Sequence, residues 1–228
     1  MNERWEIHKY AKTLQWRMEG IKNCKHCSEI NSKHLLEFHD YLLAEGLSIP
    51  RVEKYMCLLT RFDKETKGKN FLEMDKKDLI SFLAWLETTS YSEWTKKGYK
   101  VALKKFYKWA NNGELPKFVS WIKSSMKNEK KLLPQELLTP EEVIKLINSS
   151  TNPRDKAFIG MLYESGCRIG EILTIKLKHI DSDKYGLIIR VNGKTGVRRV
   201  RIISTSNLVT NWINNHPDKN SSDTYLWS

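Results

Sequence analysis

One stretch of the chain carries more chemical information than any other: Tyr163-Glu164-Ser165-Gly166-Cys167-Arg168-Ile169-Gly170-Glu171-Ile172-Leu173. Gly166 interrupts a helical pattern, and Arg168 opens a short amphipathic helix, expected over 168–177, directly after that break. Glu171 follows three residues later, within reach of the guanidinium. An arginine held by a carboxylate at a helix start is preorganised to bind an oxyanion, although in isolation these residues are more typical of an ordinary capping ion pair.

Helices are predicted before this stretch and a β-hairpin after it. Thr139 has the N-cap position of one helix, with Pro140 next to it and Glu142 completing a capping box. Asn152 starts the next helix, which runs to about Ser165. The hydrophobic period then drops to two. This period predicts two strands, at Tyr185–Val191 and Val197–Ile203, with Lys194 on the turn between them. A last helix is expected at Asn207–Asn215, followed by the start of a strand at Asp223–Trp227.

The N-terminal half is predicted to be helical throughout. Apolar residues recur at helical spacing, and Pro50, Asp75 and either Ser92 or Thr95 are residues typical of helix starts. A compact bundle of four or five helices is expected. The fold class is therefore mainly α with a small antiparallel β-sheet. The expected division is an N-terminal extension (1–30), a helical domain (31–113), a linker (114–137) and a second domain (138–228).

The composition excludes several classes of protein. Of the 228 residues, 40% are hydrophobic and 11% aromatic, which is too much for an intrinsically disordered chain. No apolar run approaches the roughly 20 residues that span a membrane, and four cysteines are too few for a disulfide scaffold, so we expect a cytoplasmic protein. The net charge of +12 favours a polyanionic partner, nucleic acid first and an anionic membrane surface second.

Two groups of basic residues are candidates for contact with nucleic acid. The first lies on one predicted helix, where Lys100, Lys104 and Lys108 share a face and Glu93 is the only nearby acidic residue. A phosphate backbone would offset the repulsion between these lysines through counterion release, whereas a solvated lysine face is the alternative interpretation. The second group lies on the hairpin. The candidate DNA-binding residues are Lys96, Lys97, Lys100, Lys104, Lys105, Lys108, Arg198 and Arg199.

Cys24 and Cys27 have the spacing of a metal-ligand pair. Zinc usually needs a second such pair, and His34 and His39 are five positions apart on a predicted helix, which is not the usual spacing. We therefore expect no metal site, and two cysteines packed against the helical bundle instead.

The order of these motifs resembles the tyrosine recombinase (phage integrase) family. The resemblance lies in Leu138-Thr139-Pro140-Glu141-Glu142, then Arg154-Asp155, then Gly166 to Leu173, and then a hairpin with Lys194 on its turn. The helical segment is similar to the SAM-like core-binding domain of that family, and residues 138–228 are similar to the first half of its α+β catalytic domain. The segment around Cys24 and Cys27 resembles the archaeal branch.

The resemblance implies DNA strand exchange through a covalent 3′-phosphotyrosine intermediate, with no metal, ATP or other cofactor. Arg168 matches the first catalytic arginine, which would bind a nonbridging oxygen of the scissile phosphate, and Glu171 matches a carboxylate that would orient it. Lys194 matches the hairpin lysine, which would protonate the leaving 5′-oxygen. The partners implied are double-stranded DNA and further copies of the chain, because full-length members of the family act as tetramers on two duplexes.

The sequence also departs from the family pattern. The family has a His-x-x-Arg box and a nucleophilic tyrosine after the hairpin, and neither His216 nor Tyr225 stands in a matching context. We therefore expect this chain to bind DNA but not to cleave it alone. Two other functions stay open. One is a non-catalytic DNA-binding regulator or remnant of a truncated integrase gene, and the other is a basic RNA-binding helical module.

Overall fold

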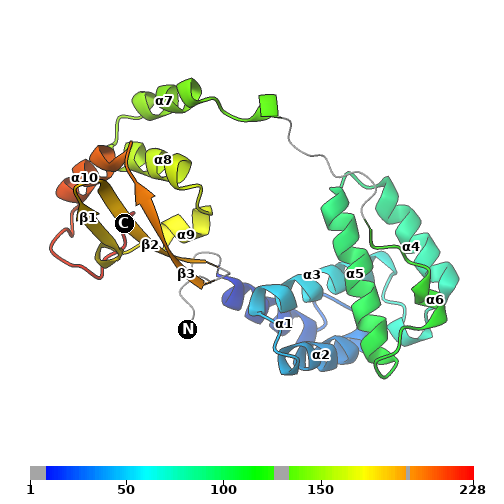
Figure 1. Ribbon diagram of the computed structural model, residues 1–228. Coiled ribbons are helices and arrows are strands. Elements are labelled where there is room, and N and C mark those ends of the chain that lie inside the picture. The colour runs from blue at the N-terminus through cyan, green and yellow to red at the C-terminus, as the bar shows by residue number, and fades with distance from the viewer. Residues whose placement is uncertain (1–8, 126–133, 194–195) are drawn as a thin grey trace. The chain divides into compact units, whose positions relative to one another are not determined.

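The computed structural model describes residues 9–125, 134–193 and 196–228 (Figure 1). These residues fall into two compact units, one within 9–125 and the other within 134–228, and each unit has its own hydrophobic core. The first unit is built of helices, and the second combines helices with a three-stranded antiparallel sheet. The predicted fold class, mainly α with a small antiparallel sheet, is confirmed.

The first unit consists of α1 (Tyr10–Lys22), α2 (Glu29–Ala44), α3 (Ile49–Glu65), a 3-10 turn (Phe71–Glu73), α4 (Lys76–Thr88), α5 (Glu93–Ala110) and α6 (Lys117–Ser120). Local capping signals set the starts of its helices. Asp75 forms a capping box with Asp78 at the start of α4. Ser92 is the N-cap of α5, because its hydroxyl accepts a hydrogen bond from the backbone N–H of Thr95 at 3.2 Å.

Aromatic side chains form the centre of the first core. Phe106 of α5 lies edge-on to Phe38 of α2 and to Phe71, with ring centroids 5.2 and 5.3 Å apart. Phe62 of α3 packs edge-on against Phe82 of α4, with centroids 4.6 Å apart. All five rings are buried. The apolar stripes predicted for α2 to α5 therefore face a common centre.

Two segments outside residues 31–113 pack against the same core. Helix α1 buries Leu14, Met18 and Ile21, although the sequence pattern placed it in an extension. Beyond α5, Val119 and Ile122 are also buried in this core, although they lie in the segment interpreted as a linker. The core is therefore larger than the predicted bundle at both ends.

A buried carboxylate joins two helices of this unit. Asp63 of α3 is only 3% exposed. It accepts hydrogen bonds from the backbone N–H and the hydroxyl of Ser28 at 2.9 and 2.8 Å, and from the side-chain amide of Asn31 at 2.6 Å. The Asn31 amide oxygen accepts in turn from the N–H of Phe71 at 2.9 Å. These bonds fix the start of α2 against the end of α3, and hydropathy patterns carry no signal for them.

The second unit consists of a 3-10 turn (Pro134–Glu136), α7 (Pro140–Ser149), α8 (Pro153–Ser165), α9 (Ile169–Leu173), a second 3-10 turn (Leu177–His179), β1 (Ile180–Asp183), β2 (Gly186–Gly193), β3 (Gly196–Ile202) and α10 (Ser206–Asn215). The capping box of Thr139 and the N-cap Asn152 are confirmed. Gly166 ends α8 with a left-handed φ of 57°, as the break in the sequence predicts.

Two predictions for this unit are wrong in detail, and one strand is absent from the predicted elements. The helix after Gly166 ends at Leu173 and does not reach position 177. Strand β1 was not predicted. The segment 223–227 forms turns with a single bridge between Tyr225 and Lys176, and no strand. A short segment with mostly exposed residues, such as β1, gives too little hydrophobic alternation to be found from sequence.

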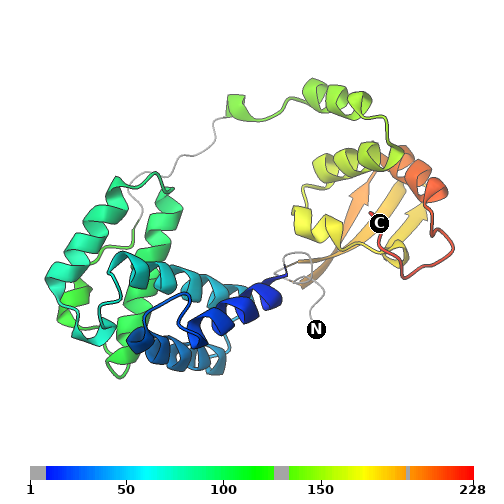
Figure 2. The same ribbon diagram turned by 180° about the vertical axis from the view of Figure 1, so that it is seen from behind.

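The sheet has the order β1-β2-β3, with Leu187 opposite Ile202 and Ile189 opposite Val200. These pairs share the face that packs into the second core, where α8 and α10 lie side by side (Figure 2). Val191 and Arg198 form the next pair on the same face. The period of two therefore directs Arg198 to the core side of the hairpin. Among the described residues, no helix is long and apolar enough to cross a membrane.

Candidate functional site

The chemistry of the second unit centres on Glu171 of α9, a carboxylate that is 3% exposed. Its Oε1 accepts from Nη1 of Arg168 at 3.2 Å, and its Oε2 accepts from the backbone N–H of Arg168 at 3.1 Å. Oε2 also accepts from Nη2 of Arg198 at 2.7 Å. One buried carboxylate therefore holds two guanidinium groups, and we refer to Arg168, Glu171 and Arg198 as the arginine–glutamate site.

Electrostatics keep Glu171 ionised over the whole physiological range. The hydrogen bond from Arg198 is the main cause that lowers the pKa of Glu171 to about 2, with further contributions from the backbone and side chain of Arg168, while burial opposes the shift. The same bond raises the pKa of Arg198 above its usual value. With two cations and one anion, the arginine–glutamate site has a net charge of +1. The Arg168 side chain is 66% exposed, although its Nη1 pairs with Glu171.

The hairpin lies directly against this carboxylate. A Cβ atom on Gly193 would come within 2.3 Å of Oε1 of Glu171 and 3.0 Å of Nη1 of Arg198, so only glycine fits without a shift. Beside it, a cavity of about 300 Å³ is bordered by Glu171, by Thr174 and by residues of β2. Lys194 follows Gly193 in the chain and, with Thr195, lies outside the described residues. Its predicted role as a general acid stays a prediction.

The arginines of β3 differ in their surroundings. Arg199 is exposed and sits opposite Arg190 on the outer face of the hairpin. Arg198 points inward and donates to Glu171. From the sequence, Arg198 is predicted to contact DNA, and its hydrogen bond to Glu171 is not predicted. The strand register carries that information, since the alternation that places Val200 inward also places Arg198 inward.

The lysines of α5 are less free than the sequence indicates. Lys96 is buried and pairs with Glu87 and with Glu93, each at 3.4 Å. Lys100 pairs with Glu87 at 2.6 Å. The prediction that Glu93 is the only nearby acidic residue is wrong, because α4 places Glu87 between two of the lysines. Their attraction lowers the pKa of Glu87, and the Lys100 hydrogen bond is the largest cause.

Other lysines of α5 divide into paired and unpaired ones. Lys105 pairs with Glu45 at 2.6 Å, and Lys104 donates to a backbone carbonyl beyond α6 at 3.0 Å. Lys97 and Lys108 have no carboxylate within ion-pair distance among the described residues. The ammonium group of Lys97 lies 5.0 Å from the ring centroid of Trp94. The free charge of α5 is therefore on the sides of Lys97 and Lys108.

Neither His216 nor the cysteine pair, for which the sequence predicts no catalytic or metal-binding role, lies in a catalytic or metal-binding cluster of the described residues. His216 is buried, and its ring bonds to the backbone N–H of Asp218 and to the carbonyl of Tyr225 at 3.0 and 3.1 Å. Cys27 is buried against the first core, and burial raises the pKa of its thiol to about 12, whereas Cys24 is exposed. Within the described part of the chain, no three or more His, Cys, Asp or Glu side chains gather to hold a metal ion.

Two segments of the chain match models of known protein families. Residues 136–227 match the model of the phage integrase family, and residues 34–117 match that of the phage integrase N-terminal SAM-like domain. The tyrosine recombinase XerA of Pyrococcus horikoshii is 33% identical over 178 residues, which are 77% of this chain and 57% of that protein. The tyrosine recombinase XerC of Natranaerobius thermophilus is 30% identical over 73% of this chain and 58% of its own length.

Solved structures show the same fold. The integrase of the transposon Tn1549, in complex with circular intermediate DNA, has a TM-score of 0.61 at 16% identity, with 85% of this chain and 70% of that chain covered. The recombinase XerH, bound to a palindromic difH substrate, has a TM-score of 0.57 at 21% identity over 81% and 58% of the chains. The chain spans less than two thirds of the length of the curated relatives named above. It belongs to the tyrosine recombinase (phage integrase) family.

Proposed function

We propose that this chain binds double-stranded DNA and that its arginine–glutamate site holds one backbone phosphate. Strand cleavage and rejoining through a 3′-phosphotyrosine need a nucleophilic tyrosine that the sequence does not offer in a matching context, so the proposal for this chain alone is binding without cleavage. The observation that carries the proposal is the sharing of buried Glu171 by Arg168 and Arg198, which leaves a net positive, exposed guanidinium. Cytoplasmic location, action as a homo-oligomer and the division into a helical DNA-binding domain and a catalytic domain belong to the same proposal.

The chemistry of phosphoryl transfer suits this arrangement. Negative charge builds on the nonbridging oxygens of the phosphate in the transition state, and a preorganised guanidinium stabilises it without reorganisation. The hydrogen bond from Nη1 of Arg168 to Oε1 of Glu171 orients that guanidinium in advance. By the family resemblance, Lys194 would donate a proton to the leaving 5′-oxygen.

Salt-dependent binding to a 30-base-pair duplex of random sequence, followed by fluorescence anisotropy, tests the proposal. Each phosphate contact adds about 0.9 to the slope of log affinity against log salt concentration. Arg168→Ala should lower that slope by about this amount. Arg154→Ala serves as the matched control because Arg154 is partly exposed, pairs with its neighbour Asp155 and lies on another helix. Equal losses in both variants, or a wild-type chain that binds no duplex, would contradict the proposal.

A further inference from the structure

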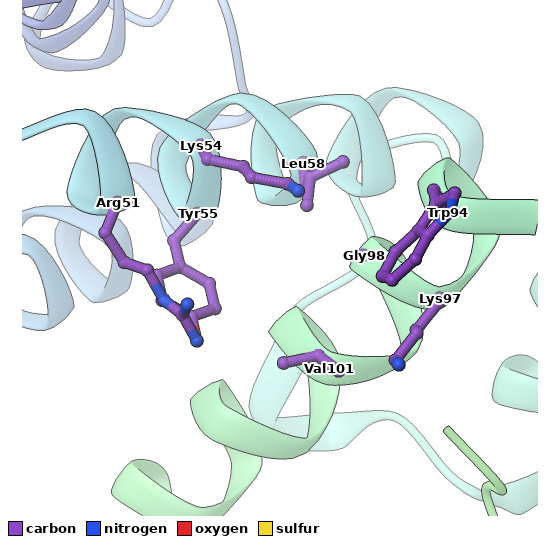
Figure 3. A pocket seen from close by; sticks show the side chains of 8 residues that line it. All are labelled: Arg51, Lys54, Tyr55, Leu58, Trp94, Lys97, Gly98 and Val101. Atoms are coloured by element: carbon purple, nitrogen blue, oxygen red, sulfur yellow. The ribbon is translucent and has the colours of Figure 1, made fainter. Parts of the chain in front are cut away.

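A pocket of about 200 Å³ lies between α3 and α5 (Figure 3). Helix α3 lines it with Arg51, Lys54, Tyr55 and Leu58, and α5 lines it with Trp94, Lys97, Gly98 and Val101. Three of these eight residues are cations and none is acidic. Arg51, Lys54 and Lys97 have no carboxylate within ion-pair distance among the described residues, in contrast to Lys96, Lys100 and Lys105 on the same unit.

Two of the three cations are held in place by aromatic rings. The ammonium group of Lys97 lies 5.0 Å from the ring centroid of Trp94, and the guanidinium of Arg51 lies 5.6 Å from that of Tyr55. Arg51 also donates to the Tyr55 hydroxyl at 3.4 Å. Trp94 is itself 58% exposed, although tryptophan is a costly residue to leave in water. Positioned cations beside an exposed aromatic ring are suited to a defined contact, because less side-chain freedom is lost on binding.

The floor of the pocket is apolar, and a glycine keeps it open. Leu58 and Val101 flank Gly98, which lies inside α5, past its first turn. A Cβ atom at position 98 would lie 3.5 Å from both Leu58 and the Lys54 stem, an ordinary contact distance, so packing does not require glycine here. Glycine within a helix costs about 1 kcal/mol relative to alanine. The chain therefore carries a destabilising residue at the position where a methyl group would cover part of the pocket floor.

We propose that this pocket reads thymine in the major groove of bound duplex DNA, with the methyl group of the base on the Gly98 floor and Arg51, Lys54 and Lys97 on the neighbouring phosphates or guanine edges. The inference rests on the proposed DNA-binding function and adds a source of sequence preference to it. The thymine methyl is the only apolar group that base pairs present in the major groove, and that groove admits an α-helix. An apolar floor with a cationic rim matches this combination.

Two synthetic duplexes of 30 base pairs test the assignment: alternating dA-dT, and the same duplex with deoxyuridine in place of thymidine. The second differs by the loss of the methyl groups. We expect the wild-type chain to bind the thymidine duplex about fourfold more tightly, the factor that corresponds to burial of one methyl group. Gly98→Ala should bind both duplexes equally while unfolding at a higher temperature, because alanine favours the helix and its methyl group takes the place on the floor proposed for the thymine methyl.

Two variants that each lose one positive charge distinguish a contact in the pocket from general electrostatic attraction to DNA. Lys97→Ala should weaken binding of both duplexes and reduce the thymidine preference, whereas Lys108→Ala, on the same helix but outside the pocket, should leave the preference at its wild-type value. If Gly98→Ala keeps the full preference, or if the wild-type chain shows none while it binds duplex with strong salt dependence, the pocket assignment fails and the proposed function stands. A wild-type chain that binds neither duplex overturns both.

Discussion

At the scale of single residues, Glu171 determines how the second unit responds to acid. Its folded-state pKa of about 2 lies below the ordinary value of 4.5, chiefly because of the hydrogen bond from Arg198. A lowered pKa means that Glu171 contributes stability above its unfolded-state pKa and loses it as the pH falls toward the folded-state value. We predict that Glu171→Gln flattens the dependence of unfolding free energy on pH between about 4.5 and 2, as measured by denaturant titration. Parallel curves for the two proteins would contradict this.

Gly193 gives a second prediction at this scale. The added methyl group of Gly193→Ala would overlap the Glu171 carboxylate and crowd Arg198, so we expect a loss of about 1–3 kcal/mol in unfolding free energy and weaker duplex binding. Gly170→Ala is the control, since a Cβ atom there meets nothing within 4 Å and the position is helical. That variant should be as stable as the wild type or more so. Thermal unfolding of both variants in parallel decides the matter.

At the scale of elements, the sequence predicts contacts between residues that are close in the chain and misses contacts between residues that are far apart in it. The Arg168–Glu171 pair spans three positions and was found, as were the caps at Thr139 and Asn152. The bond between Glu171 and Arg198 joins residues 27 positions apart and depends on strand register, which hydropathy does not reveal. Helix α1 was missed because its few apolar residues acquire meaning only against α2 and α3.

The hydrogen bonds of Asp63 join α2 to α3, and their contribution to the unfolding free energy can be measured. Asp63→Ala would leave the Ser28 N–H and the Asn31 amide without their acceptor in a buried place. We predict a loss of more than about 2 kcal/mol in the unfolding free energy of the first unit, measured by denaturant titration. Asp40→Ala provides the comparison, because its side chain is 83% exposed, and it should change stability by less than about 0.5 kcal/mol. Similar losses in both would show that the Asp63 network adds little.

At the scale of the whole molecule, the two hydrophobic cores share no residue. A unit with its own core can fold alone. We therefore predict that residues 8–131, prepared as a separate protein, keep helical circular dichroism and unfold in one cooperative transition. That transition should match one of two transitions seen in the whole chain by calorimetry. A non-cooperative melt of the fragment would show that its helices depend on the rest of the chain.

The pairing of Lys96, Lys100 and Lys105 with Glu87 and Glu45 has a consequence for kinetics. Counterion release sets how long a basic protein stays on DNA of any sequence, and each neutralised lysine removes part of that attraction. Under the proposed DNA-binding function, a helix whose lysines already pair with carboxylates of the same chain would dissociate sooner from DNA of random sequence. The same pairing would then shorten each stay on random DNA and speed the search for a preferred site.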